Sequence, residues 1–250
     1  MSKKRVSLTL EEGLVSRLDA EADQNSVNRS QQVEMIIDRF FEGRSVSKAV
    51  VFCGGKDTEV MQEYRARPVL EHVISHLASE EIREVYLLCG RNEEDICSRL
   101  GESVEGVDLT YVSEDSPEGT AAALEKIKDE INETFVAVNG HVLTDVDLEE
   151  MVRVHREEER LCTMALTSVE DPEGYGVARL KGREIKGFEE KPDRALSRLI
   201  NAGTYVFDPE IFSRLDENSL EDVFEDLADT GELSGYIYGG KWEYVSGSSD

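Results

Sequence analysis

The sequence lacks the usual marks of a membrane or secreted protein. No stretch approaches the roughly 18 consecutive apolar residues that a membrane-spanning helix needs, and the first residues contain no apolar signal-peptide core. Only four of the 250 residues are cysteine, and no two of them form a Cys-x-x-Cys pair, so buried free thiols are expected. We therefore expect a cytoplasmic protein with no membrane partner.

Positive charge is also scarce. The chain has 28 lysine and arginine residues against 54 aspartate and glutamate residues, which gives a formal net charge of −26. Such a surface repels DNA, while regular apolar periodicities exclude a disordered acidic chain. Because concentrated salt screens charge over short distances, the composition predicts a salt-adapted, haloarchaeal host. The 39% of hydrophobic residues suffice for one α/β core and a small second module.

The pattern of the first 45 residues predicts one strand followed by two helices. Residues 3–10 alternate, with Arg5, Ser7 and Thr9 on one face and apolar residues on the other, as in a half-buried strand. Amphipathic helices are predicted from residue 11 to the polar turn at residues 24–26, and from residue 28 to Gly43. So short a segment cannot close a core, and a lone strand has two unpaired edges. We expect it to exist only as a dimer with paired antiparallel strands.

This arrangement resembles the ribbon-helix-helix repressors. The resemblance implies a homodimer, formed through the N-terminal ribbon, whose ribbon enters the major groove of DNA while the start of the second helix holds phosphate. The implied DNA-binding residues are Arg5, Ser7 and Thr9 on the ribbon and Asn28, Arg29 and Ser30 at the helix start. Residues 1–45 carry only about −1 of the net charge of −26, which favours DNA as the partner. An arm that only dimerises remains an alternative.

From residue 48 onward the chain alternates between apolar strands and helices. Strands are predicted at residues 49–52, 85–89, 109–112 and 135–138, and helices at residues 68–77, 95–100, 121–131 and 148–158. This order predicts an α/β fold with a doubly wound, mostly parallel sheet of the Rossmann type and a ligand crevice at the carboxyl ends of the strands. The expected ligand is a nucleotide. The expected domains are residues 1–45 and residues 48–250.

Seven short motifs follow one another along the second domain. They are Gly54-Gly55, Arg67-Pro68-Val69-Leu70-Glu71-His72, Gly119-Thr120-Ala121, Asn139-Gly140-His141 with Asp145 and Asp147, Gly174-Tyr175-Gly176, Glu190-Lys191-Pro192 and Asn201-Ala202-Gly203. In this order they resemble the sugar-phosphate nucleotidyltransferases, which join a nucleoside triphosphate to a sugar 1-phosphate and release pyrophosphate. The resemblance implies nucleotide binding at Gly54, Gly55, Lys56, Gly119 and Thr120 and sugar binding at Gly176, Glu190, Lys191 and Asn201.

Two parts of the sequence depart from the pattern that the resemblance implies. The glycine-rich loop contains Asp57 and Glu59, two carboxylates where a polyanion should rest. His141 stands at the position of one Mg²⁺-binding aspartate, and Tyr244, next to Glu243, stands near the other. Imidazole is a poor Mg²⁺ ligand, so an ordinary hydrogen-bonded role for His141 is favoured. We assign no metal site, and expect Mg²⁺ as a cofactor only if catalysis is retained.

Three functions fit these observations. The main prediction is a DNA-binding transcriptional regulator whose degenerate transferase-like domain senses a sugar phosphate, a nucleotide or a nucleotide-sugar. The first alternative is an active sugar 1-phosphate nucleotidyltransferase with substituted catalytic residues. The second alternative is an architectural or partition-type DNA-binding protein. The departures at the triphosphate loop and the metal positions favour the main prediction.

Overall fold

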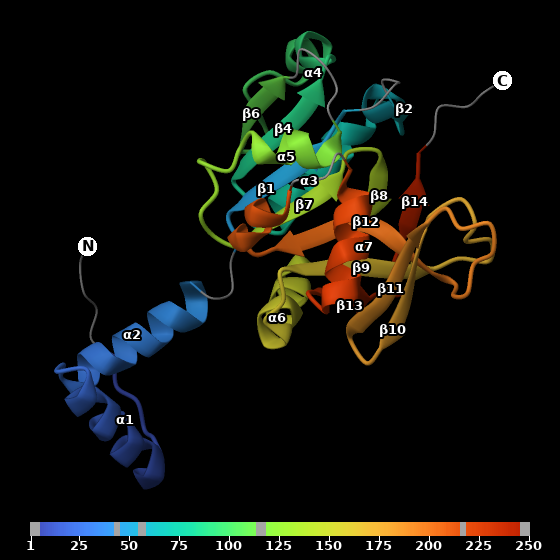
Figure 1. Cartoon of the computed structure of the whole chain (residues 1–250). Helices are drawn as coiled ribbons and strands as arrows, with labels where there is room; N and C mark the ends of the chain where they lie inside the picture. The colour runs from blue at the N-terminus through green and yellow to red at the C-terminus, as the bar shows by residue number, and fades with distance from the viewer. Residues whose placement is uncertain (1–5, 43–45, 55–58, 114–118, 216–218, 246–250) are drawn as a thin grey trace. The chain divides into compact units, whose positions relative to one another are not determined.

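The computed structural model describes residues 6–42, 46–54, 59–113, 119–215 and 219–245. By its internal contacts the chain divides into two compact units, Met1–Ser45 and Val46–Asp250, both drawn in Figure 1. Within the described residues, no helix is both long enough and apolar enough to cross a lipid bilayer.

The first unit contains two helices, α1 (Glu12–Gln24) and α2 (Arg29–Glu42). Asn28 begins the second helix with a reciprocal cap: its side chain accepts a hydrogen bond from the Gln31 backbone N–H, and the Gln31 side chain accepts one from the Asn28 N–H, both at 3.0 Å. The described residues 6–10 form no strand. The predicted strand at residues 3–10 is therefore absent from its described part, residues 6–10, because a strand exists only against a hydrogen-bonded neighbour.

Apolar side chains of the first unit face solvent. Val6 and Leu8 are 72% and 61% exposed, and Leu10, Leu14, Ile36 and Ile37 are exposed as well. Among the described side chains of this unit, Ala22 and Gln32 are the buried ones. The described side chains of this unit, residues 6–37, therefore form almost no core of their own.

The second unit is built on a ten-stranded sheet. In order across the sheet, its strands are β10 (Gly176–Lys181), β11 (Glu184–Glu190), β13 (Leu233–Ile237), β9 (Cys162–Ser168), β12 (Leu199–Phe207), β7 (Phe135–Asn139), β1 (Lys48–Phe52), β4 (Glu84–Gly90), β6 (Val107–Ser113) and β5 (Ser103–Val104). Two small ladders pair β14 (Trp242–Tyr244) with β8 (Val142–Thr144), and β2 (Glu63–Tyr64) with β3 (Arg67–Pro68).

The sheet is mixed, and its parallel part is smaller than predicted. Strands β7, β1, β4 and β6 run parallel, as the alternation of strands and helices indicates. Strand β12 lies between β9 and β7 and is antiparallel to both, and β10 and β11 form an antiparallel pair. The prediction of a mostly parallel sheet is wrong for this half, because β9 to β12 follow one another without intervening helices that would return the chain.

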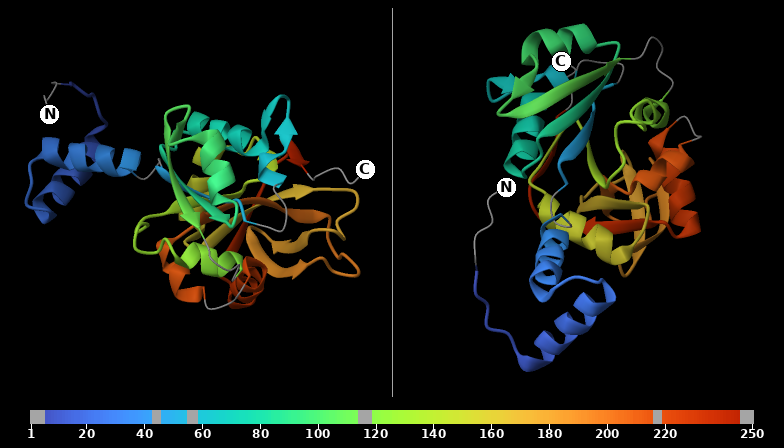
Figure 2. Two further views of the ribbon diagram at one scale, coloured as in Figure 1. Left: turned by 90° about the horizontal axis from the view of Figure 1, so that it is seen from above. Right: turned by 90° about the vertical axis from the view of Figure 1, so that its left-hand side faces the viewer.

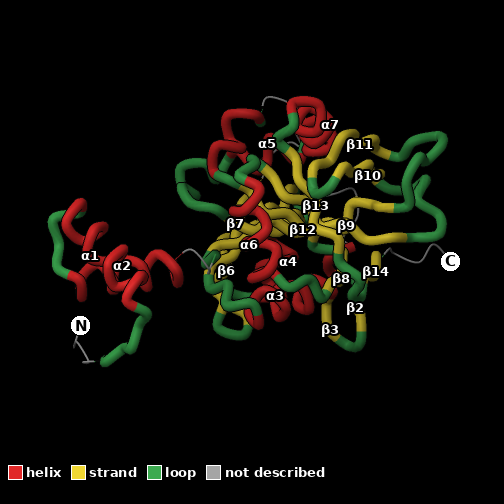
Figure 3. The backbone as a smooth tube through the Cα atoms, turned by 90° about the horizontal axis from the view of Figure 1, so that it is seen from below, coloured by secondary structure: helices red, strands yellow, loops and turns green. Residues whose placement is uncertain are grey.

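Helices cover both faces of the sheet. They are α3 (Val69–Ser79), α4 (Glu93–Leu100), α5 (Thr120–Glu125), α6 (Leu148–Glu158) and α7 (Leu220–Thr230), with 3₁₀ turns η1 (Glu59–Met61) and η2 (Pro209–Arg214). Helices α3, α4 and α6 pack on one face around Val51 and Leu87, and α5 and α7 pack on the other around Phe135 and Phe207, as Figures 2 and 3 show. Burial on both faces explains why the central strands β1, β4, β7 and β9 are almost continuously apolar.

Helix boundaries differ from the prediction at one notable place. Helix α5 ends at Glu125, and residues 126–130 form turns, whereas the pattern predicted a helix over residues 121–131. Ile127 and Ile131 are nevertheless buried, so the apolar spacing continues after the helix has ended. Helix α6 begins as predicted: Asp147 caps it by accepting from the Glu150 N–H at 2.8 Å.

Candidate functional site

A cavity of about 660 Å³ opens where β7 ends and β12 begins, a size suited to a small-molecule ligand. We call it the sugar cavity. Its described lining comes mostly from turns and strand ends, and consists of Asn139, His141, Val142, Asp171, Gly174, Tyr175, Gly176, Glu190, Lys191, Asn201, Gly203, Glu221, Trp242 and Tyr244.

Two glycines are required by the shape of this cavity. Gly203 has a φ of +75°, and a Cβ there would lie 2.8 Å from the Asn139 Nδ2, so both its conformation and its surroundings exclude a side chain. At Gly176, a Cβ would clash with the ring of Phe188 and would lie 2.8 Å from Glu190 Oε2. The polar groups of the cavity therefore approach the backbone closely only because these residues are glycine.

Asn201 is held rigidly at the start of β12. Its Oδ1 accepts a hydrogen bond from the Gly203 backbone N–H at 2.9 Å, and its Nδ2 donates to the Tyr205 hydroxyl at 2.8 Å. Tyr205 is buried, and burial raises the pKa of its hydroxyl, which therefore stays protonated. One amide hydrogen of Asn201 is then left to face a ligand.

A carboxylate and an ammonium lie side by side at the end of β11. The Lys191 Nζ is 3.3 Å from Glu190 Oε1. Burial raises the pKa of the Glu190 carboxyl, and the Lys191 ammonium offsets only part of that shift. The Lys191 backbone N–H donates to the Tyr175 carbonyl at 3.1 Å, which fixes the turn. This pair provides an acceptor for hydroxyl groups beside a cation for an anionic group.

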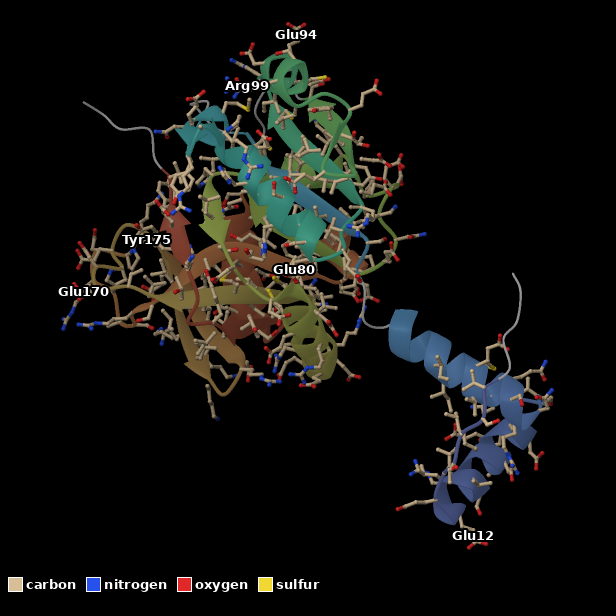
Figure 4. The ribbon with its side chains drawn as sticks, turned by 180° about the vertical axis from the view of Figure 1, so that it is seen from behind. Glu12, Glu80, Glu94, Arg99, Glu170 and Tyr175 are labelled. Atoms are coloured by element: carbon tan, nitrogen blue, oxygen red, sulfur yellow. The ribbon has the colours of Figure 1, made fainter. Side chains whose placement is uncertain are left out.

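Aromatic rings form one wall of the cavity. Tyr175, labelled in Figure 4, meets Trp242 edge to face at 5.4 Å between ring centroids, and His141 meets Tyr244 at 4.9 Å. The Trp242 Nε1 donates to the Ala202 carbonyl at 3.2 Å, so β14 is tied to β12. These contacts give the cavity a rigid apolar surface beside its polar groups.

The residues at the two implied Mg²⁺ positions do not fit that ion. His141 and Tyr244 pack ring against ring, where hard oxygen ligands would have to converge. The neighbouring carboxylate of Glu243 accepts a hydrogen bond from the Tyr64 hydroxyl at 2.7 Å. Within the described part of the chain, no group of three or more His, Cys, Asp or Glu side chains could hold a metal ion.

The structure brings together all four residues of the predicted sugar site, Gly176, Glu190, Lys191 and Asn201. On the predicted nucleotide side, Gly54 follows β1 at the same edge of the sheet, because Phe52 pairs with Asn139 and its carbonyl accepts from the Gly140 N–H at 3.0 Å. Gly54, Gly119 and Thr120 are not part of the described cavity lining.

Other predicted nucleotide-binding residues lie elsewhere. Thr120 begins α5 and its hydroxyl accepts a hydrogen bond from the Leu220 backbone N–H at 3.0 Å, a contact that ties α5 to α7. Gly55 and Lys56 lie outside the described residues. The nucleotide residues thus stay a prediction.

Sequence reasoning missed three polar or aromatic residues of the cavity, Glu221, Asp171 and Trp242, besides the apolar Val142. Glu221 enters it from the first turn of α7, and Asp171 enters from the turn after β9. No spacing in the sequence links either residue to the motifs, so no signal was available for them. Trp242 stands two positions before Tyr244 and is the single tryptophan of the chain. These two facts could have indicated that it belongs to the site.

The predicted DNA-binding residues lie on the first unit. Ser7, Thr9 and Ser30 are exposed, and Arg5 lies outside the described residues. Arg29 donates two hydrogen bonds of 2.6 Å to the carboxylate of Asp19 on α1, and those bonds lower the pKa of Asp19. In the single chain the Arg29 guanidinium is therefore already paired with a carboxylate.

The fold and the cavity together define a class. A mixed α/β sheet holds a polar and aromatic cavity beyond the carboxyl end of a parallel strand, the place where such sheets bind ligands. Comparison with known sequences makes the class specific: the nucleotidyl transferase family model matches residues 56–245, and the chain belongs to that family.

Similar proteins carry related names. The chain is 29% identical over 223 residues to a mannose-1-phosphate guanylyltransferase catalytic subunit beta of Drosophila pseudoobscura pseudoobscura, covering 82% of this chain and 60% of that protein. It is 28% identical over 228 residues to a mannose-1-phosphate guanylyltransferase of Mycobacterium tuberculosis, covering 81% and 64%. The chain thus spans about three fifths of the length of these relatives. A UDP-glucose pyrophosphorylase solved with UDP-glucose shares the fold at a TM-score of 0.69 and 21% identity, covering 79% and 92%.

These names contradict our main functional prediction, a DNA-binding regulator with a degenerate sensor domain. They favour the first alternative, a working transferase with substituted residues. The prediction placed too much weight on a few ligand positions, although the similarity extends over most of the second unit. A changed ligand removes one interaction, whereas catalysis in a preorganised site depends on many groups together.

Proposed function

We propose that the protein is an active sugar 1-phosphate nucleotidyltransferase, with mannose 1-phosphate and GTP as the first substrates to test. The observation that carries the proposal is the sugar cavity, which gathers Gly176, Glu190, Lys191 and Asn201 in a member of this family. In the reaction a phosphate oxygen of the sugar 1-phosphate attacks the α-phosphorus of the nucleotide, and pyrophosphate leaves.

The chain's own residues supply binding and orientation. Glu190 is an acceptor for sugar hydroxyls, the Asn201 amide is a fixed donor, and the Lys191 ammonium offsets phosphate charge. On the nucleotide side, Gly54, Gly55, Gly119 and Thr120 are proposed to approach the triphosphate, with Lys56 as its cation.

The test is pyrophosphate release by the full chain. We compare three substrate pairs: GTP with mannose 1-phosphate, UTP with glucose 1-phosphate, and dTTP with glucose 1-phosphate. Each pair is measured in 0.1 M and in 2 M KCl, and at each salt concentration with Mg²⁺, with Mn²⁺ and with a chelator. We expect turnover with at least one pair. Lys191→Ala should lower kcat/KM for that pair, while Lys181→Ala on the exposed end of β10 should not. Cooperative melting without turnover on any pair under any condition would refute the proposal.

We also propose that the first unit joins two copies of the chain through a ribbon built from residues 3–10. The exposure of Val6, Leu8 and Leu10 supports this, since a second strand would cover them. Light scattering of the full chain should give a dimer, Leu8→Asp should give a monomer, and Ser7→Asp, one residue away on the opposite face, should remain dimeric. A monomeric parent chain would refute the proposal.

On such a ribbon Arg5, Ser7 and Thr9 would face outward, and we propose DNA as the partner of this unit. Backbone N–H groups at Asn28, Arg29 and Ser30 would hold phosphate, that of Asn28 in exchange for its bond to the Gln31 side chain, since the Arg29 side chain is already paired with Asp19. Fluorescence anisotropy with duplex DNA in molar KCl should show binding that Arg5→Ala weakens. Equal affinity of both proteins would contradict the assignment.

A salt-rich cytoplasm, haloarchaeal in origin, is the proposed setting. The net charge of −26 and the four cysteines, all free thiols, support it. Transfer activity that rises between 0.1 M and 2 M KCl would agree with this setting, and inactivation over the same range would contradict it.

A further inference from the structure

A second cavity, of about 670 Å³, lies at the opposite end of the same strands. Its lining includes Thr134 just before β7, Leu161 just before β9 and Asp208 just after β12. The lining of the sugar cavity includes residues from the other ends of two of these strands, Asn139 of β7 and Asn201 of β12. Six residues of β12, 202–207, separate Asn201 from Asp208, or about 20 Å. The two cavities are therefore separate sites at opposite ends of β7 and β12, the two strands labelled in Figure 1.

Three arginines line this second cavity, Arg156, Arg160 and Arg214, and we call it the arginine cavity. The concentration is unusual in a chain with 28 basic residues against 54 acidic ones, where an arginine has an excess of carboxylates to pair with. Arg160 donates to the Gly231 carbonyl and lies 3.8 Å from Glu184. Arg214 lies 3.4 Å from Asp226. These two guanidinium groups have partners.

Arg156 is different. Among the described residues it forms no hydrogen bond and no ion pair, and its Nη1 is buried without a hydrogen-bond partner. Burial lowers the pKa of its guanidinium, which means that the surroundings do not compensate its charge. The side chain is partly exposed, but its Nη1 is not, and a cation with a buried, unpartnered N–H group is unfavourable unless something supplies an acceptor. The neighbouring Arg160 also has a buried nitrogen without a hydrogen-bond partner, its Nε.

The carboxylates of the cavity restrict what that anion is. Glu159, Asp208, Glu210 and Glu232 line the same space, and they repel a bare anion. They favour a ligand that also offers hydrogen-bond donors, because ionised carboxylates only accept. A phosphorylated sugar meets both requirements, since its phosphate suits guanidinium groups and its hydroxyls suit carboxylates.

We propose that the arginine cavity is a second ligand site, which binds a sugar phosphate with the phosphate against Arg156 and Arg214 and the hydroxyls against Asp208 and Glu232. It lies away from the cavity assigned to the transferase substrates. The ligand of the arginine cavity does not have to be a substrate of the transfer reaction. Its phosphate therefore does not have to be attached to C1 of the sugar.

Calorimetric titration of the full chain with glucose 6-phosphate tests the proposal. The probe has no phosphate on C1, so it does not offer the group that the transfer reaction uses. The titration is done in 1 M KCl, which screens the net charge of −26. We expect saturable binding that Arg156→Gln weakens at least tenfold. Arg153→Gln, on the same helix but half exposed and paired with Glu150 and Glu157, should leave the affinity within twofold.

Three further variants and one further ligand distinguish this site from the sugar cavity and from simple anion binding. Arg156→Lys keeps the charge but not the planar fork, and should bind with intermediate affinity. If Arg156→Gln does not fold, Arg214→Gln gives the same test, because its side chain is 39% exposed. Asn201→Ala in the sugar cavity should have no effect. The proposal would be overturned if glucose 6-phosphate did not bind, or if the arginine variants bound it as tightly as the parent. It would also be overturned if Asn201→Ala lost binding, or if inorganic phosphate bound as tightly as glucose 6-phosphate.

Discussion

The sugar cavity and the arginine cavity lie at opposite ends of β7 and β12, and they have nearly the same volume, about 660 and 670 Å³. They are built differently. The sugar cavity is shaped by glycine turns and aromatic rings, such as Gly203 and Trp242, whereas the arginine cavity is formed by the ends of helices and by charged side chains such as Arg156. The backbone thus shapes the first cavity, and charged side chains shape the second.

The strongest test of this difference is Gly203→Ala. The residue has a φ of +75°, and its new Cβ would lie 2.8 Å from the Asn139 Nδ2. We expect the free energy of unfolding to fall by roughly 2–4 kcal/mol and the transfer rate to fall about 100-fold. Urea unfolding and pyrophosphate release measure the two effects. The matched control is Gly182→Ala, where φ is +65° but no atom lies within 4 Å of the new Cβ. Equal losses in both variants would show that strain, and not the contact with Asn139, decides the outcome.

The next test concerns His155, at the arginine cavity. Its side chain is buried, its Nδ1 lies 3.0 Å from the Thr163 hydroxyl, and burial lowers its pKa to about 4. A lowered pKa favours the neutral imidazole in the folded protein. The stabilisation is therefore complete above the unfolded value near 6.5 and is lost as the pH falls toward 4.

Over that pH range the parent protein should lose roughly 2–4 kcal/mol more than His155→Gln, whose side chain does not titrate. Urea unfolding at pH 7.5, 5.5 and 4.5 measures the difference. His76→Gln, which removes another histidine of the same unit, is the control for the loss of an imidazole. Parallel curves for the parent and His155→Gln would contradict the assignment.

Asn201→Ala is expected to have a smaller effect, confined to the sugar cavity. The change removes the hydrogen bonds to the Gly203 N–H and the Tyr205 hydroxyl, at a cost of about 1–2 kcal/mol. The KM for the sugar 1-phosphate should rise about tenfold, with a smaller change in kcat. Steady-state kinetics with varied sugar phosphate and saturating nucleotide separate the two. Asn92→Ala, at a helix start where the side chain makes no cap bond, should leave both constants unchanged.

The two cavities also differ in how far the sequence predicts them. Gly176, Glu190, Lys191 and Asn201 stand in short turn motifs, and turns at the ends of strands meet at one edge of a sheet. Arg156, Asp208 and Glu232 stand in no motif, and only the folding of distant segments brings them together. A site made of glycine turns is thus visible in one sequence, whereas a site made of scattered charges is not.

The fold shows the same limit. Strands β1, β4 and β7 were predicted close to their observed places because burial on both faces makes each an apolar run, and β6 was predicted although its burial alternates. The position of β12, antiparallel between β9 and β7, was not predicted, because the direction of a strand depends on which strands pair with it in three dimensions. The predicted strand at residues 3–10 is a related case, since its pairing would require a second copy.

The smallest expected effect is spectroscopic. Trp242 is the single tryptophan of the chain, it lies in the sugar cavity, and its Nε1 donates to the Ala202 carbonyl. A nucleotide-sugar that enters this cavity should change the tryptophan emission by a modest shift in wavelength or intensity. Glucose 6-phosphate in the arginine cavity should leave it unchanged, because about 20 Å of sheet separates the two sites. If the emission responds equally to both ligands, either the two ligands share one site or the strands transmit a structural change from one site to the other. The same titrations in Asn201→Ala distinguish these two cases. Binding at one shared site weakens for both ligands, whereas a transmitted change leaves the affinity for glucose 6-phosphate intact.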